Sequence, residues 1–319
     1  LNVQAFMTAL LSFIFVRWKP AFVFSKESFR SLFGFGSKLL IAQTISTVYV
    51  NLYNIAIGKR YTAAQLGLYT RARQFGEIVS TNLTSVMTRV LFPVLSRVQD
   101  NDAQMMAAYR KFIAMVAFIV FPCSLGLCGI ARPLVVSLIG EKWLGCVPLL
   151  QILTFAYLCD GITIINLNLL YVKGKSDIVL KLEIIKKSIA VAFLLIAIRY
   201  GVTAICISLV IYSFIALIIN TRNTKKLLDY GFLNQMADLF PYLLCSLTIM
   251  ALAFLSDFVF DNNWLSLSVS LILCPLVYIA LCRIFKLDAQ KEMVSIITSN
   301  KYCPKWFDRL IKKLYPALS

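Results

Sequence analysis

The segment Leu66–Val98, LGLYTRARQFGEIVSTNLTSVMTRVLFPVLSRV, decides the fold class, because it has the length of a long membrane helix and yet carries charges. Those charges are Arg71, Arg73, Glu77 and Arg89. A charge at membrane depth costs about 2.5–3.5 kcal/mol on insertion scales and usually faces a bundle interior or a water-filled cavity. The segment therefore predicts a membrane helix with one side against a polar interior.

The composition of the whole chain is that of an integral membrane protein. Of its 319 residues, 60% are hydrophobic and 15% are charged, whereas a soluble domain carries about 25% charged residues. We interpret the net charge of +17 as basic loops on one side of a membrane, not as a nucleic-acid surface. The chain has no His and no CxxC pair, which argues against a zinc site, a haem and histidine-based catalysis. We expect no enzyme activity and no cofactor.

Eight apolar segments predict eight complete membrane helices. Most have the ~20 residues that cross ~30 Å of hydrocarbon, and backbone groups in lipid must pair within their own segment, which favours helices over strands. The expected spans are 35–57, 66–95, 112–130, 147–171, 184–198, 202–220, 238–256 and 264–282. The span 184–198 is short, and we expect it to extend into its flanking residues.

The loop charges alternate between a basic side and a side poor in cations. The basic side has 23 lysines and arginines, which include Lys173, Lys175, Lys181, Lys186 and Lys187 in one predicted loop. The other side has five: Lys59, Arg60, Arg132, Lys142 and Arg199. By the positive-inside rule the basic side, with the C-terminus, is cytoplasmic.

The chain divides into three parts. Residues 1–16 are apolar and are followed, not preceded, by positive charge, so we interpret them as the end of a truncated transmembrane helix and not as a signal peptide. We therefore expect a C-terminal fragment of a longer membrane protein. Residues 17–285 form the membrane domain, a C-terminal half of seven to eight helices. Residues 286–319 form a basic cytoplasmic tail, either an amphipathic helix on anionic lipid or a disordered segment.

Two of the predicted helices carry stripes of uncharged polar side chains. In the span 35–57, Gln43, Asn51 and Asn54 share one helix face. Along Leu66–Val98 a second stripe contains, besides Glu77, the uncharged residues Thr70, Gln74, Thr81, Thr84 and Thr88. Both stripes should face protein or water. Packing between helices is the alternative, because Ser and Thr also join helices in membranes.

The charged residues within the predicted helices have several readings. Arg73 and Glu77 are four residues apart and can pair, while Arg71 lies about 200° around the helix from Arg73. One arginine is then free for an anion or a lipid headgroup. Arg71 and Lys38 lie near helix ends, where they can also reach the interface. Asp160, in the middle of its helix, predicts a proton or sodium site or an ion pair.

Three motifs resemble the polysaccharide flippase family. Tyr61–Ala72, YTAAQLGLYTRA, resembles its first motif, and Val90–Asp100, VLFPVLSRVQD, resembles the continuation. Gly140–Trp143, GEKW, followed by Val147 and Pro148, resembles a third. The nearest branch is the Wzx-type, WzxC/TuaB-like lipopolysaccharide and teichuronic-acid exporters of the MOP superfamily, which are relatives of the MATE transporters.

The resemblance implies an all-α fold, a MATE/MOP-like helical bundle, and it also implies a cargo and partners. Fourteen helices in two halves would surround a central cavity, of which this chain would hold the end of helix six and helices seven to fourteen. The cargo would be an undecaprenyl-diphosphate-linked oligosaccharide, moved across the bacterial inner membrane by alternating access. The implied partners are this substrate, membrane lipid, a coupling proton or sodium ion, and polysaccharide polymerases.

The resemblance also suggests roles for the polar residues. Cations suit a diphosphate or acidic sugars, amides suit sugar hydroxyls, and acids suit ion pairing or coupling. The substrate-binding candidates are Arg71, Arg73, Lys38 and Arg89 for anions, with Gln43, Asn51 and Asn54 for the glycan. The coupling candidates are Glu77 and Asp160.

Two other functions stay open at this point. A MATE-like, cation-coupled exporter of small molecules would place acids rather than arginines in its cavity. A membrane glycosyltransferase or O-antigen polymerase would commonly carry a large extracytoplasmic loop or a soluble catalytic domain, and neither is present in these 319 residues.

Overall fold

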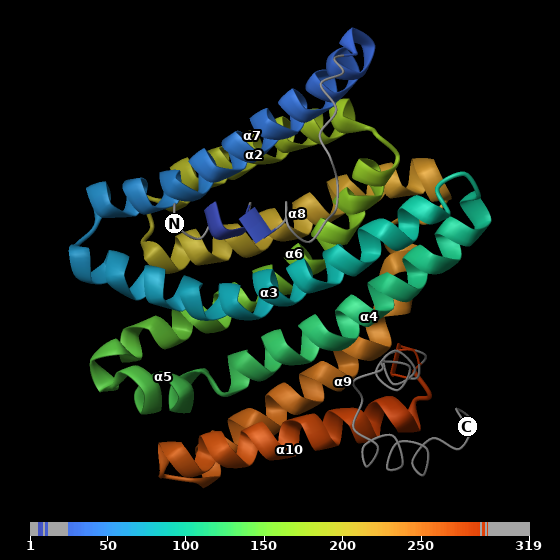
Figure 1. Cartoon of the computed structure of the whole chain (residues 1–319). Coiled ribbons are helices and arrows are strands. Elements are labelled where there is room, and N and C mark those ends of the chain that lie inside the picture. The colour runs from blue at the N-terminus through green and yellow to red at the C-terminus, as the bar shows by residue number, and fades with distance from the viewer. Residues whose placement is uncertain (1–5, 9, 12–24, 288, 291, 293–319) are drawn as a thin grey trace.

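The computed structural model describes residues 6–8, 10–11, 25–287, 289–290 and 292, and within them it contains helices and turns but no strand (Figure 1). The elements are α2 (Lys26–Arg60), α3 (Ala63–Arg97), α4 (Asp102–Gly129), α5 (Ala131–Ile139), a 3-10 helix η1 (Glu141–Cys146), α6 (Val147–Val172), α7 (Ser176–Ala197), α8 (Val202–Leu228), α9 (Phe232–Val259) and α10 (Asn263–Ile284). The predicted all-α class is confirmed.

Local sequence explains where the helices begin and end. Thr62 caps α3 through a capping box with Gln65, and the side chain of Asn101 accepts a hydrogen bond from the Gln104 N–H at the start of α4. Gly140 ends α5 with φ of 92°, a backbone conformation that residues with a side chain rarely adopt. The turn it makes sends the chain into η1 and then α6.

Seven helices of the described residues are long and apolar enough to cross a membrane. Each of the eight predicted spans coincides with a helix, and the eighth helix, α7, falls outside the seven because of its charges. The short span 184–198 does extend into its flank, since α7 begins at Ser176. The chain is therefore a multi-pass membrane protein, as its composition predicts.

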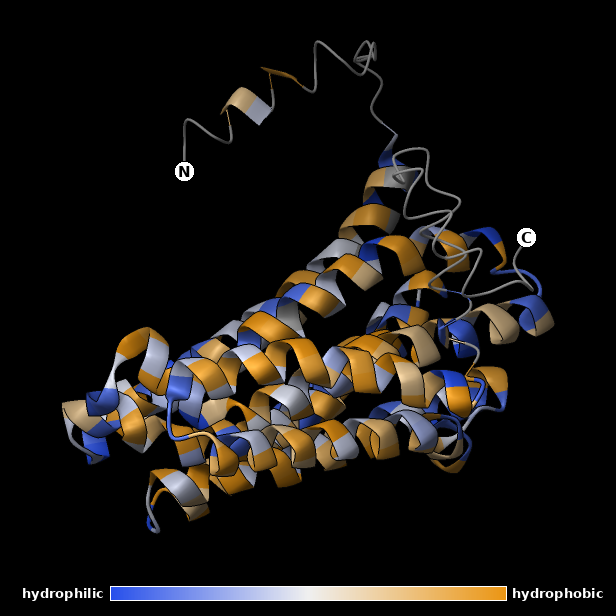
Figure 2. Cartoon of the chain, turned by 90° about the horizontal axis from the view of Figure 1, so that it is seen from below, coloured by the Kyte–Doolittle hydropathy of each residue, from blue (hydrophilic) through white to orange (hydrophobic). Residues whose placement is uncertain are grey.

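The long helices lie roughly side by side (Figure 1). Helices α2 and α7 pack together at one edge, and α3, α6 and α8 form the middle of the bundle. Helix α4 joins this middle layer to α9, and α10 covers α9 at the other edge. Figure 2 shows hydrophobic residues along the helix bodies and hydrophilic residues gathered at the helix ends.

We call the two ends of the bundle by their turns. The basic end holds the turns at 98–101, 173–175 and 229–231, and the opposite end holds the turns at 61–62, 140–146 and 198–201. At the opposite end the Tyr61 hydroxyl accepts a hydrogen bond from the Gly201 N–H and donates one to the Ile198 carbonyl. This contact joins the ends of α2, α7 and α8.

A buried polar network locks three helices together near the basic end. The Asn166 amide of α6 exchanges hydrogen bonds with Gln235 of α9, at 3.1 and 3.0 Å, and accepts one from Thr224 of α8, at 2.6 Å. All three side chains are almost fully buried. Because buried polar groups are costly unless paired, this network favours one arrangement of the helices.

The two terminal parts predicted from the sequence lie mostly outside the described residues. Of the expected truncated helix at 1–16, the structure describes 6–8 and 10–11, which are helical. Of the tail at 286–319, it describes 286–287, 289–290 and 292. The amphipathic helix expected at 305–315 lies outside the described residues.

Candidate functional site

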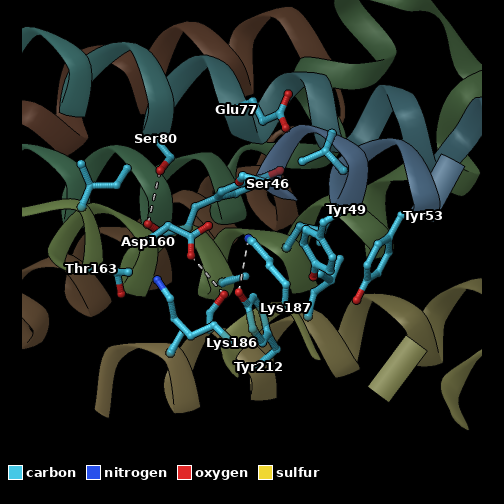
Figure 3. A pocket seen from close by; sticks show the side chains of 18 of the residues that line it. Ser46, Tyr49, Tyr53, Glu77, Ser80, Asp160, Thr163, Lys186, Lys187 and Tyr212 are labelled. Atoms are coloured by element: carbon cyan, nitrogen blue, oxygen red, sulfur yellow. Dashed lines mark hydrogen bonds between the residues drawn. The ribbon is translucent and has the colours of Figure 1, made fainter. Parts of the chain in front are cut away.

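A cavity of about 340 Å³ lies inside the bundle among α2, α3, α6, α7 and α8. Figure 3 shows the side chains that point into it. The position of the cavity along the helices follows from Asp160, which comes 13 residues after the start of α6 and therefore lies ~20 Å from that helix end. Since a hydrocarbon core is ~30 Å thick, the cavity lies at membrane depth.

Helix α3 contributes an inward face of Tyr69, Arg73, Glu77 and Ser80. These residues recur every three to four positions and so point the same way. The Arg73 Nε donates to the Glu77 carboxylate at 2.6 Å, which confirms the predicted pair. The Tyr157 hydroxyl of α6 donates to the Arg73 carbonyl at 3.3 Å and holds this face against α6.

Helix α7 contributes three charged residues to the cavity: Glu183, Lys186 and Lys187. Lys186, only 3% exposed, donates to Glu183 at 2.5 Å, and the Lys187 ammonium lies 4.0 Å from the second Glu183 oxygen. The assignment of both lysines to a cytoplasmic loop was therefore wrong. Helix α7 starts eleven residues before Lys187, so the loop ends well before these two lysines.

Two tyrosines enclose the Lys187 ammonium. The nitrogen lies 4.2 Å from the centroid of the Tyr49 ring on α2 and 5.6 Å from that of Tyr212 on α8, and it is 3.4 Å from the Tyr212 hydroxyl. A ring face attracts a cation, more strongly when both are shielded from water. We call Lys187, Tyr49 and Tyr212 the lysine cage (Figure 3).

Asp160 of α6 completes the charged lining. Its carboxylate accepts a hydrogen bond from the Ser213 hydroxyl of α8 at 3.2 Å and points toward the lysine cage (Figure 3). One helical turn further, the buried Thr163 hydroxyl oxygen lines the same cavity and has no hydrogen-bond partner within the described residues. A ligand hydroxyl or a water could therefore bind there.

The charges of the cavity balance. Three cations, Arg73, Lys186 and Lys187, face three acids, Glu77, Asp160 and Glu183. An entering anion must therefore compete with a carboxylate for its cation, and an entering proton or metal ion must compete with a cation for its carboxylate. Such a cavity can exchange one ion pair for another without leaving a charge unpaired at membrane depth.

Only three of the nine candidate residues predicted from the sequence line this cavity: Arg73, Glu77 and Asp160. Arg71 points away from it and is exposed, as its position 200° from Arg73 requires. Lys38 pairs with Asp177 of α7 at 2.6 Å. Arg89, Gln43 and Asn51 are exposed, and Asn54 is half-buried with its amide oxygen unpaired in the described part of the chain.

The sequence contained signals for the residues that were missed. Glu183, Lys186 and Lys187 have the i, i+3 and i+4 spacing of one helix face. Tyr49 and Tyr53 are likewise four residues apart on α2. What the sequence could not supply is the pairing of α7 with α2, which lie more than a hundred residues apart and pack together in the structure.

Comparison with known proteins agrees with the fold and the motifs. Residues 2–148 match the family described as polysaccharide biosynthesis protein. The chain is 28% identical over 162 residues to the teichuronic acid biosynthesis protein TuaB of Bacillus subtilis (strain 168), a match that covers 51% of this chain and 34% of TuaB. It is also 28% identical over 169 residues to the lipopolysaccharide biosynthesis protein WzxC of Escherichia coli (strain K12), with 53% of this chain and 34% of WzxC covered.

Among solved structures, the lipid II flippase MurJ in an inward closed conformation has the same fold, with a TM-score of 0.65 at 16% identity. The alignment covers 86% of this chain and 58% of the MurJ chain. The matched regions of TuaB and WzxC amount to about a third of those proteins. The predicted resemblance to polysaccharide biosynthesis proteins such as TuaB and WzxC is therefore confirmed over about half of the chain, and the fold is like that of MurJ.

Proposed function

We propose that this chain forms part of a transporter that moves a diphosphate-linked, lipid-anchored oligosaccharide across the bacterial cytoplasmic membrane. The observation that carries the proposal is the charged cavity at membrane depth, within a fold shared with a lipid II flippase. Transport of an anionic glycolipid needs cations and polar groups at the depth of the hydrocarbon core, where such groups are costly when they face lipid. The cargo would cross the membrane without covalent change, so no residue would act as a catalyst.

The exposed faces of α2 and α3 support a pathway beside the cavity. Only 22% and 24% of the residues in their most apolar windows are buried, against 67% in α4. The uncovered surface includes Gln43, Asn51, Gln74 and Arg89. Since polar side chains at membrane depth rarely face lipid, these faces are best explained as a wall that other protein segments or water cover.

The roles of the individual residues follow from their positions. Arg73, with the lysines of α7, would hold phosphate as Glu77 and Glu183 release them. Gln43, Asn51 and Asn54 would contact sugar, and Lys38 and Arg89 would attract the anion near the ends of the pathway. Asp160 and Glu77 would take part in coupling to a proton or sodium ion. The basic end would face the cytoplasm, where polysaccharide polymerases and the lipid carrier would be partners.

The test is export of surface polysaccharide by the complete protein in its own bacterium. Arg73→Gln and Lys187→Gln should each lower export about tenfold or more at equal protein level, and lipid-linked oligosaccharide should accumulate on the cytoplasmic leaflet. Arg199→Gln, which removes an exposed cation at the opposite end, is the matched control. Normal export in both cavity variants would contradict the proposal.

The three acids of the cavity also favour a second candidate, a cation-coupled exporter of small amphipathic molecules. This function predicts that cells lacking the protein become sensitive to cationic dyes or drugs. It predicts no accumulation of lipid-linked sugar. Measuring both quantities in one deletion strain separates the two functions.

A further inference from the structure

A second cationic cluster lies at the opposite end of the bundle, outside the cavity. The Arg71 guanidinium of α3 lies 5.3 Å from the centroid of the Trp143 ring of η1, and the Lys142 ammonium lies 5.9 Å from the same ring. Two cations thus share one aromatic side chain. Both are exposed, and neither has an acid within 4.0 Å in the described part of the chain, although Glu141 is adjacent in sequence.

The cluster has a firm base. The Trp143 ring lies across Gly67, where a Cβ atom would come 3.8 Å from the ring. Two residues later in η1, a Cβ at Gly145 would come 2.9 Å from the Leu68 side chain. These contacts pack η1 directly on the first turns of α3. The two segments that carry family motifs therefore meet in space, and Arg71 and Lys142 are brought together by that contact.

The surroundings place the cluster at the boundary between lipid and water. Leu144, which follows Trp143 in η1, is 40% exposed, and Leu138 near the end of α5 is 56% exposed, so this end of the bundle presents apolar side chains as well as cations. Tryptophan is enriched at this boundary, because its ring is apolar and its N–H is polar. An arginine fork suits the oxygens of a phosphate, and a lysine adds a second point charge.

We infer that Arg71, Lys142 and Trp143 form a binding site for the phosphate group of an anionic phospholipid in the leaflet at the opposite end. The phosphate lies between the guanidinium and the ammonium, the Trp143 ring supports both cations, and the acyl chains run along the exposed leucines. The bound lipid bridges α3 to η1. Of the other cations at this end, Arg132 is paired with Asp257 at 3.5 Å, which leaves it outside the site.

The inference is tested by lipid retention on the complete purified protein, independently of transport. The protein is extracted from nanodiscs of phosphatidylcholine containing one tenth phosphatidylglycerol, and bound lipids are counted by native mass spectrometry. Wild type should retain phosphatidylglycerol in preference to phosphatidylcholine. In the double variant Arg71→Gln, Lys142→Gln, the ratio of retained phosphatidylglycerol to retained phosphatidylcholine should fall by about fivefold for each cation removed.

The matched control is the double variant Lys59→Gln, Arg199→Gln, which removes two exposed cations from the same end. It should retain the preference, and so should Trp143→Phe, which keeps an aromatic face. An equal loss in the control would overturn the inference, because it would show a general effect of charge. A third arm adds undecaprenyl diphosphate at the concentration of phosphatidylglycerol. Displacement of phosphatidylglycerol by this carrier would also overturn it, because the site would then belong to the transported lipid.

Discussion

The ring of Tyr157 on α6 lies against Gly76 on α3, so closely that a Cβ at position 76 would come 2.1 Å from the ring carbon Cε2. The absence of a side chain at Gly76 therefore lets the two helices approach. Tyr157 lines the cavity, and its hydroxyl holds the Arg73 carbonyl. The position of the Arg73–Glu77 pair thus depends on this contact.

We predict that Gly76→Ala lowers both stability and transport. The added methyl must displace the Tyr157 ring or separate α3 from α6, at a cost of about 1–3 kcal/mol. The measurements are thermal unfolding in detergent and polysaccharide export. Gly126→Ala is the control, because a Cβ at Gly126 meets nothing within 4 Å and helix propensity favours Ala by about 0.5–1 kcal/mol. Equal unfolding temperatures in the two variants would contradict the prediction.

The lysine cage gives a prediction that separates a ring face from a hydroxyl. Tyr49→Phe keeps the face over Lys187 and should export polysaccharide at a rate close to that of wild type. Tyr49→Leu removes about 2 kcal/mol of cation–π attraction at this shielded site and should lower export by tenfold or more. A Phe variant as defective as the Leu variant would show that the hydroxyl, not the ring, is needed.

Asp160 is predicted to act in coupling rather than in binding. Asp160→Asn keeps a hydrogen-bond acceptor for Ser213 but leaves three cations facing two acids. We expect the variant to bind the lipid diphosphate at least as tightly as wild type. Transport should lose its dependence on the proton or sodium gradient, measured in vesicles with an imposed gradient. Gradient-dependent transport at the wild-type rate would contradict a coupling role.

The buried network near the basic end predicts non-additive stability effects. Asn166→Leu leaves the Thr224 hydroxyl and the Gln235 amide oxygen without their partner, while the Gln235 amide nitrogen keeps its hydrogen bond to the Tyr230 carbonyl. Each unpaired buried group costs about 1–3 kcal/mol. The double variant Asn166→Leu, Gln235→Leu removes both amides that exchange hydrogen bonds. Its loss of unfolding free energy should be smaller than the sum of the two single losses. Additive losses would show that the two amides do not depend on each other.

Much of the fold could be predicted from the sequence, because membrane helices are specified locally. Each needs a long apolar run and forms its backbone hydrogen bonds within itself. The eight predicted spans therefore coincide with helices, although no contact between helices was used to predict them. The Arg73–Glu77 pair was predictable for the same reason, since both residues lie on one helix and their spacing alone sets the distance.

The site could be predicted only in part, because it depends on which helices meet. Helical spacing separated Arg71 from Arg73, but it could not say which of them faces the interior. The lysines of α7 were missed because their charge favoured a loop, although Lys186 and Lys187 fall inside the predicted span 184–198. Their real environment comes from Tyr49 on α2 and Tyr212 on α8, and no local pattern in α7 indicates either residue.

The charges of α7 have a consequence for biogenesis. A segment with Asp177, Lys181, Glu183, Lys186 and Lys187 among its first twelve residues is poorly suited to leave the translocon alone. Its neighbour α8 is strongly apolar and follows after a short turn closed by Gly201. We therefore expect α7 and α8 to enter the bilayer together as one hairpin. Helix α2 is synthesised much earlier, so it is already in the membrane when Lys187 packs against it. Helix α7 has no cysteine, so the test uses Ser188→Cys as the only cysteine of the chain. Ribosome-bound chains that end before α8 should then leave this cysteine accessible to water-soluble thiol reagents, and chains that end after α8 should not.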